Sequence, residues 1–248
     1  TINVANSDGG NAKVVATIPM GGASCGPVAW NHLGTRIYFG NSDPDKSIAS
    51  VRADGTGGIT QYNQALGGVT ALDVSDDGRF LACIASTGFD GTLNIARVNP
   101  ATGALTDWKD LTQGEPSWMY NQTTTRPNAY GNDLGFAPNP PAGKQILVYG
   151  TAKQGGMLGN THHQYVAEIN EATLGATIQP LKDSFGNDIV AHSPSFSPLG
   201  DKLAVTLGDF SFDGVWVWNW DPLTSPPKVA SGVRIDAETQ LFMWIVWR

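Results

Sequence analysis

The chain has 248 residues, enough for one large domain or two small ones with a substantial core. It contains 30 glycines and 15 prolines, and only 15% of its residues are charged; this composition excludes helical bundles, coiled coils and disordered chains and favours turn-rich, all-β structure. The net charge of −7 argues against nucleic acid as a partner, because phosphate binding requires clustered basic residues.

The first segment, residues 2–18, consists of two short apolar stretches on either side of an Asp-Gly-Gly turn, which predicts a pair of antiparallel strands. From residue 27 onward a longer unit repeats. Each copy opens with a β-hairpin in which apolar stretches flank a turn rich in Asp, Pro and Gly, at 28–39, 71–82, 134–149 and 194–205. A second pair of strands with an Asp or Asn turn follows each hairpin, at 48–55, 93–103, 165–175 and 215–222.

The repeated unit therefore has four strands, and the interval from Gly34 to Gly78 matches the length of a WD40-type propeller blade. We assign the blades to residues 27–66, 69–112, 130–182 and 190–230.

The two ends of the chain complete this pattern. Residues 230–248 have the form of a first strand pair, and residues 1–20 have the form of a second pair. Pairing between them would form one composite blade, close the ring and remove exposed sheet edges. The sequence thus predicts an all-β fold in which residues 1–248 form a single domain, a closed β-propeller of five four-stranded blades. Six or seven blades are the alternative if the chain is a fragment of a longer one.

Two stretches resemble known propeller families. Residues 196–204, Phe-Ser-Pro-Leu-Gly-Asp-Lys-Leu-Ala, resemble the hairpin motif of TolB-type propellers. Residues 74–81 together with 92–106 resemble a blade of the lactonase-like and YncE-like propellers. Lactonase-like proteins usually have seven blades, and these motifs encode a blade and not an activity. No catalytic residue is therefore carried over from the resemblance.

In a propeller, the connections between blades and those between the second and third strands of a blade emerge on one face, here called the loop face. The longest connections of this chain fall there, and they carry the candidate binding residues Trp108, Trp118, Tyr120, Arg126 and Tyr130 (107–132), His162 and His163 (153–164), and Asp209 and Phe210 in the fourth blade. Long loops on a rigid scaffold concentrate binding residues. The alternative is that the 107–132 connection packs on its neighbours, with its aromatic side chains buried for stability.

Motifs for catalysis and metal binding are weaker. Residues 22–26 match the nucleophile-elbow pattern, but an extended segment and no helix follows them. His162 and His163 lack zinc-site spacing. No metal or other cofactor is expected; calcium is the alternative, although the aspartates at 43, 45, 90, 209 and 213 lack the spacing of a calcium loop. We expect Cys25 and Cys83 to be free and buried.

Trp216, Trp218 and Trp220 alternate along one strand and therefore share a face. Packing between blades is the expected role. A carbohydrate-stacking platform is the alternative, and it requires that face to be exposed to solvent.

No signal peptide is visible, and the longest strongly apolar stretch, 241–247, is too short to span a bilayer, so we expect cytoplasmic synthesis and no membrane insertion. The sequence leaves the final compartment open. The low charge and abundant Gly, Asn and Thr resemble bacteriophage virion proteins. The sequence favours a non-enzymatic recognition or assembly module, a structural or receptor-facing part of a phage particle or a comparable complex, with a protein or a surface glycan as partner. A lactonase-like hydrolase and a carbohydrate-binding lectin are the alternatives.

Overall fold

The computed structural model describes residues 1–6, 8–17, 27–41, 47–86, 91–112, 134–154, 160–183, 185–207, 214–223 and 228–235. Within these ranges every helix or strand assigned is a β-strand, and no helix there is long and apolar enough to cross a membrane. The strands form one two-stranded and four four-stranded antiparallel sheets. The all-β expectation is confirmed.

The two-stranded sheet is the N-terminal hairpin of β1 (Ile2–Val4) and β2 (Lys13–Ala16), as expected for the second half of a blade. Among the described residues, β1 pairs only with β2. Residues 236–248, which are predicted to complete this sheet, lie outside the described residues. Closure of the ring therefore stays a prediction.

Each of the four larger sheets takes its strands in sequence order. Blade 1 consists of β3 (Val28–Trp30), β4 (Arg36–Gly40), β5 (Ile48–Arg52) and β6 (Ile59–Tyr62). Blade 2 consists of β7 (Gly68–Val74), β8 (Phe80–Ser86), β9 (Gly91–Val98) and β10 (Leu105–Asp110). Blade 3 consists of β11 (Leu134–Phe136), β12 (Lys144–Gln154), β13 (Asn160–Asn170) and β14 (Ala176–Pro180). Blade 4 consists of β15 (Ala191–Phe196), β16 (Lys202–Leu207), β17 (Gly214–Asp221) and β18 (Lys228–Arg234).

These strands correspond to the four repeats found in the sequence, with one difference at the end of blade 4. β18 runs to Arg234, with Val233 opposite Val217 and Arg234 opposite Trp216. Residues 230–234, which we assigned to the terminal blade, thus pair within blade 4. The reason is that β17 is eight residues long and offers β18 a full-length partner.

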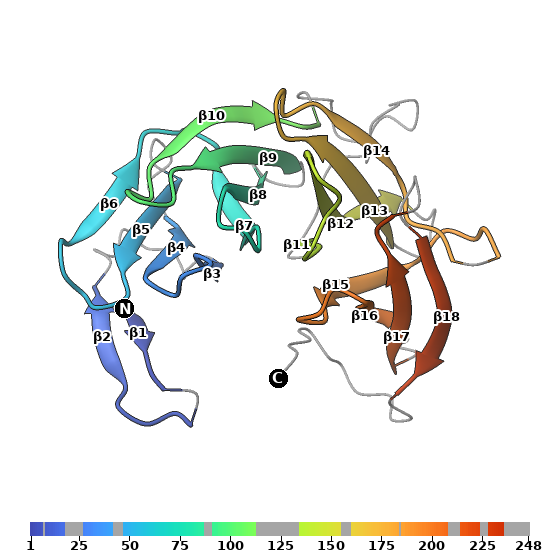
Figure 1. Cartoon of the computed structure of the whole chain (residues 1–248), viewed down its shortest axis with the longest axis horizontal. Coiled ribbons are helices and arrows are strands. Elements are labelled where there is room, and N and C mark those ends of the chain that lie inside the picture. Colours follow the sequence, from blue (N-terminus) through green and yellow to red (C-terminus); the bar gives the residue numbers. More distant parts are fainter. Residues whose placement is uncertain are drawn as a thin grey trace.

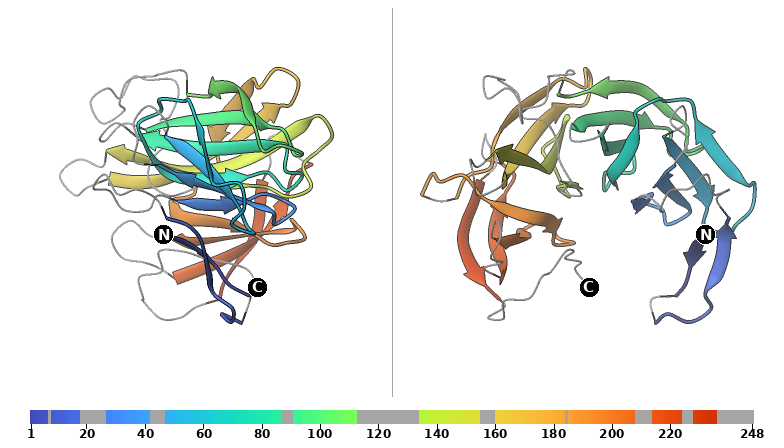
Figure 2. Two further views of the ribbon diagram at one scale, coloured as in Figure 1. Left: turned by 90° about the vertical axis from the view of Figure 1, so that its left-hand side faces the viewer. Right: turned by 180° about the vertical axis from the view of Figure 1, so that it is seen from behind.

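The sheets stand side by side around an arc (Figure 1). The first strands of the four blades, β3, β7, β11 and β15, lie nearest the centre, and the fourth strands lie at the periphery. Seen from behind, the N-terminal hairpin and blade 4 form the two ends of the arc (Figure 2). The inner strands of successive blades therefore face a common central space.

In blades 2 and 4, the turns between first and second strands share one polar arrangement. In blade 2, the Ser75 hydroxyl accepts the backbone N–H of Phe80 (3.0 Å) and donates to Asp77 Oδ1 (2.7 Å). Ser197 makes the equivalent two bonds in blade 4. These bonds use polar groups that a tight turn would otherwise leave unpaired. The end of blades where these turns lie is here called the turn face.

The core lies between the blades. Tyr38 and Phe39 are adjacent in β4 and are 0% and 1% exposed. Tyr38 packs in a cluster shared with blade 2, and Phe39 packs in a cluster shared with the N-terminal hairpin. In β12, Ile146 likewise faces blade 4 while Leu147 faces blade 2. Both faces of each of these sheets are apolar, so each sheet needs a neighbour on either side.

A polar cluster on the turn face ties blade 2 to blade 3. The Glu171 carboxylate accepts hydrogen bonds from both terminal nitrogens of Arg79, at 3.1 and 2.6 Å, and from Gln145 Nε2 at 2.7 Å. Arg79 and Gln145 also donate to Asp77 Oδ2, at 2.8 and 3.1 Å. Such bidentate, charge-assisted bonds fix orientation as well as distance. They hold the two blades in one relative position.

Gly143 and Gly200 provide a matched test of packing between blades 3 and 4. Both have positive φ, 76° and 72°. A Cβ at Gly200 would lie 2.9 Å from the carbonyl oxygen of Pro138, whereas one at Gly143 would meet nothing within 4 Å. We expect Gly143→Ala to lower the free energy of unfolding by about 1 kcal/mol and Gly200→Ala by about 2–4 kcal/mol, because only the second adds a clash to backbone strain. Chemical denaturation measures both losses, and equal losses would contradict the prediction.

Candidate functional site

Six of the nine loop-face residues predicted from the sequence lie outside the described residues: Trp118, Tyr120, Arg126, Tyr130, Asp209 and Phe210. Their role in binding stays a prediction, as does that of the connection around 113–133. Trp108 and His163 are described with their side chains, and they do not lie in the predicted loops.

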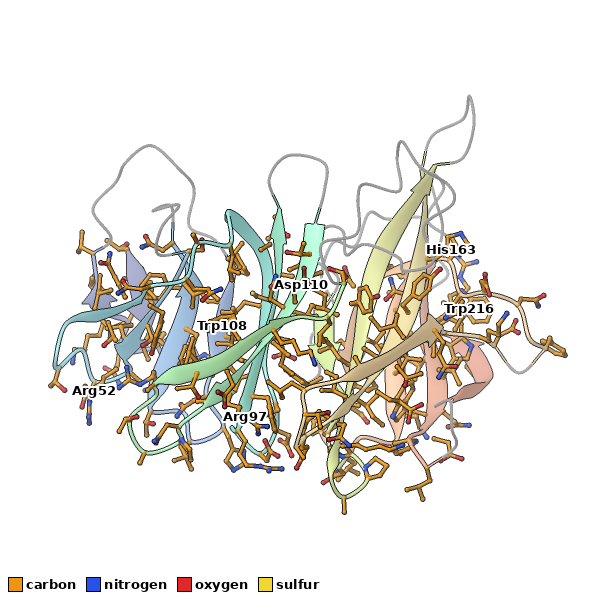
Figure 3. The ribbon with its side chains drawn as sticks, turned by 90° about the horizontal axis from the view of Figure 1, so that it is seen from above. Arg52, Arg97, Trp108, Asp110, His163 and Trp216 are labelled. Atoms are coloured by element: carbon orange, nitrogen blue, oxygen red, sulfur yellow. The ribbon has the colours of Figure 1, made fainter. Side chains whose placement is uncertain are left out.

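Trp108 was expected at the start of a loop, but it lies in β10, which continues to Asp110 (Figure 3). The register of β10 shifts between Thr106 and Lys109, and Asp107 takes a positive φ of 52°, so the strand passes through a bulge and resumes pairing. The Trp108 ring is half-buried and packs against the cluster between blades 1 and 2. This packing agrees with the alternative for Trp108, and its predicted role in binding stays untested.

His162 and His163 were also expected in a loop, and they lie in β13 instead. The β12–β13 hairpin keeps its pairing up to Gln154 and Asn160, which places His162 opposite Ala152 and His163 opposite Thr151. The His163 side chain is mostly buried, and its Nδ1 lies 3.8 Å from Asp188 Oδ2. The role of the two histidines in binding stays a prediction.

The tryptophan stripe of β17 is packing. Trp218 and Trp220 are 7% and 5% exposed and belong to the cluster between blades 3 and 4. The Trp216 and Trp218 rings stack with centroids 6.1 Å apart, and Phe196 meets Trp220 edge-on at 5.0 Å. The carbohydrate-stacking platform is therefore excluded for Trp218 and Trp220.

The expectation for Cys83 is confirmed: it is a free, buried thiol. Burial raises the pKa of this thiol well above its ordinary value. Cys25 lies outside the described residues. In the part of the chain that is described, no group of three or more His, Cys, Asp or Glu residues could hold a metal ion.

The inner strands of the four blades surround a cavity of about 980 Å³. Its described lining comes from β3, β7, β11 and β15 and the residues next to them. The volume falls in the range of small-molecule sites, about 300–1,000 Å³. The lining combines the aromatic rings of Phe136 and Phe196 with the carboxyl groups of Asp73 and Asp76 and the hydroxyls of three serines at 193, 195 and 197.

Asp73 connects two blades at the wall of this cavity. Its Oδ2 accepts the backbone N–H of Phe136 in β11 at 2.8 Å, and its Oδ1 accepts the N–H of Val74 at 2.9 Å. Burial raises the pKa of Asp73 to about 6, although these two hydrogen bonds act in the opposite direction. The carboxyl group therefore changes its charge close to neutral pH.

The connection between β14 and β15 presents an aromatic side chain that the sequence analysis did not identify. Phe185 is 88% exposed. Asp183 Oδ1 accepts the backbone N–H groups of Phe185 (2.9 Å) and Asn187 (2.8 Å). Lys182 Nζ donates to Asp188 Oδ1 at 2.9 Å, and these two residues also form an isolated β-bridge. Because this segment joins two blades, it belongs to the loop face.

A local signal for this connection exists in the sequence. Asp183 is followed by a Gly-Asn pair at 186–187, and aspartate, glycine and asparagine are residues that build turns stabilised by their own side chains. Gly186 takes a φ of 87°, which the turn requires and which other residues rarely adopt. The pattern predicts a tight turn, and an aromatic residue inside such a turn is a candidate for an exposed side chain.

Comparisons with known proteins identify the fold. The sequence matches no protein-family model and no curated protein. The structure is similar to the Dos1 propeller, with a TM-score of 0.57 and 15% identity over 96% of this chain. The fold is that of a β-propeller. A putative TolB from Agrobacterium tumefaciens has a TM-score of 0.52 and 12% identity over 92% of this chain, so the expected resemblance to TolB-type propellers holds at the level of fold.

A third similar structure is the hydrazine synthase of Kuenenia stuttgartiensis, with a TM-score of 0.50 and 14% identity over 86% of this chain. The aligned region spans 50% of the Dos1 propeller chain, 66% of the TolB chain and 55% of the hydrazine synthase chain. At such low identity the likeness concerns the fold alone, because one fold hosts many unrelated functions.

Asp73 leads to a pH-dependence prediction. Folding raises its pKa from 3.8 to about 6, so the folded state holds the proton more tightly than the unfolded chain does. This contribution to stability is complete below pH 3.8 and is lost as the pH rises through 6. Asn does not titrate, so the variant lacks this loss. Between pH 4 and pH 7 we expect the free energy of unfolding of the wild type to fall by roughly 2–3 kcal/mol relative to that of Asp73→Asn.

Denaturant unfolding at several pH values measures this difference. Asp8→Asn, an exposed residue of the N-terminal hairpin, is the matched control and should follow the wild type. Parallel pH profiles for the wild type and Asp73→Asn would show that burial does not perturb this carboxyl group.

Proposed function

We propose that this chain is a non-enzymatic β-propeller recognition module that binds a protein partner through its loop face. The observation that carries the proposal is Phe185, a large apolar side chain that is 88% exposed on a connection fixed by its own hydrogen bonds. Single exposed apolar residues are common on protein surfaces. Phe185 differs because Asp183 holds the backbone of its turn through two hydrogen bonds.

The setting lowers the cost of binding. Ordering a mobile loop and its side chains on association costs free energy, and a loop that is already ordered avoids much of that cost. Aromatic anchors that enter a pocket of the partner supply a large share of the binding energy in many interfaces. Lys182 and Asp188, which are half-exposed beside Phe185, provide the polar rim that such an anchor usually has.

The finer proposal is that the partner belongs to a bacteriophage particle or a comparable assembly. Its support is compositional: few charged residues and abundant Gly, Asn and Thr, as in virion proteins. In this role the stacked blades serve as a rigid scaffold, and the partner contacts lie on the connections between them.

We also propose that the ring is closed as a five-bladed propeller. The edge of β1 that faces away from β2 would pair with the segment around Leu241–Trp247, whose apolar residues suit a buried strand. The support is that blades 1–4 are four-stranded, whereas the N-terminal sheet has two strands among the described residues. Closure would complete that sheet and cover its edge.

Ring closure predicts that β1 is protected from hydrogen exchange by the C-terminal segment. In the full-length chain, Ile245→Pro should speed exchange at Asn3 and its neighbours and lower the melting temperature, because proline removes a ladder hydrogen bond. Glu238→Pro, in the expected turn before that strand, is the control and should leave β1 protected. Unchanged exchange in Ile245→Pro would refute closure by this segment.

Partner binding predicts site-specific crosslinking. With the photoreactive residue benzoylphenylalanine in place of Phe185, we expect irradiation in an extract of the source organism to link the chain to one discrete protein. The same residue in place of Leu223, which is 80% exposed on the turn face, is the control and should give no discrete product. Asp183→Ala should reduce the yield several-fold by releasing the loop. Crosslinking from neither position, or equally from both, would contradict the proposal.

A further inference from the structure

The central cavity has a one-sided charge distribution. Of its described lining residues, the only ionisable ones are Asp73 and Asp76; β3, β11, β15 and their adjoining residues contribute none. Arg79, close by in the sequence, is engaged on the turn face with Asp77 and Glu171. Negative groups in a concave, low-dielectric site focus their field into it and favour a cationic occupant.

Asp73 retains acceptor capacity toward such an occupant. Each of its carboxylate oxygens receives one hydrogen bond, and both donors are neutral backbone N–H groups. A carboxylate has about four acceptor sites, so further donors can bind to it. No cation contributes to the raised pKa of this group, whose causes are burial and the two backbone bonds. When ionised, Asp73 is thus a partly buried negative charge without a described counter-charge.

The remaining lining selects the kind of cation. Leu134 and Phe136 in β11, Val69 in β7 and Phe196 in β15 line the same cavity. Phe196 is held edge-on against Trp220, so this part of the wall is packed from behind. Contact between an apolar wall and an apolar group removes both from water and is favourable. The same wall has no polar atoms to replace the water molecules around a small inorganic ion.

We propose that this cavity is a binding site for a small organic ammonium ion that carries an alkyl or aralkyl group, with Asp73 as the counter-charge and the Phe136–Phe196 wall as the apolar contact. The ammonium group donates to the free lone pairs of the Asp73 carboxylate. The apolar group lies against the rings. This site does not include Phe185, so a failure of one proposal leaves the other unaffected.

The test is isothermal titration calorimetry of the full-length chain with 2-phenylethylammonium, hexylammonium and cyclohexylmethylammonium at pH 7.5. We expect saturable binding of at least one of them at one site per chain. The neutral analogue 2-phenylethanol should bind at least about tenfold more weakly, because it lacks the charge that pairs with Asp73. At pH 5 the affinity should fall about tenfold, because only the ionised fraction of Asp73 pairs with the ligand.

Three variants assign the binding to the cavity. Asp73→Asn should weaken the affinity at least tenfold, while Asp8→Asn, an equal change in net charge on the N-terminal hairpin, should leave it unchanged. Val28→Trp enlarges a half-exposed lining residue without touching Asp73 and should also weaken binding, which keeps the test decisive if Asp73→Asn does not fold.

Several outcomes would overturn the proposal. These are the absence of binding for all three amines, equal binding of 2-phenylethanol, or equal affinity in the wild type and in both cavity variants. Calcium that competes with the amine and depends on Asp73 would also overturn it, since the site would then be a metal site.

Discussion

Each blade of this protein is a sheet with two apolar faces, and the need to bury both is the constraint on which the rest of the structure depends. In β8, Phe80 and Ile84 pack toward blade 3, whereas Leu81 and Cys83 pack toward blade 1. Such a sheet is not stable alone in water. Blades must therefore stack, their twist turns the stack into an arc, and the inner strands come to surround a common space.

Polar contacts reinforce this stack where a blade's third-to-fourth-strand turn meets the preceding unit. The carbonyl of Asp54 in blade 1 accepts from Lys13 of the N-terminal hairpin at 2.6 Å, and the carbonyl of Gly103 in blade 2 accepts from Tyr62 of blade 1 at 2.7 Å. In blade 3, the side chain of Glu171 accepts a hydrogen bond from Arg79 of blade 2. Three successive interfaces thus share one arrangement. It gives the cavity and the loop face a rigid support, which binding sites require.

Local sequence patterns predicted the four blades because a hairpin turn and the alternation of apolar residues are short-range features. The same patterns failed where strands continued past a turn-like sequence. Asp107 suggested a loop, but a bulge absorbs it and Trp108 stays in β10. His163 stood in an apparent loop, yet β12 and β13 extend past it because each provides the other with partners. Strand length depends on the partner strand, and a single segment does not reveal it.

The sequence by itself determined the repeat, the positions of the turns and the all-β class, since each rests on residues close together in the chain. The tertiary structure decided which residues distant in the sequence come into contact and which side chains stay exposed. It brought Asp73 of β7 against the Phe136 amide of β11, 63 residues apart, and placed both at a shared cavity. It also left Phe185 exposed while burying Trp218. Burial and pairing across blades are properties of the stack, so no local pattern carries them.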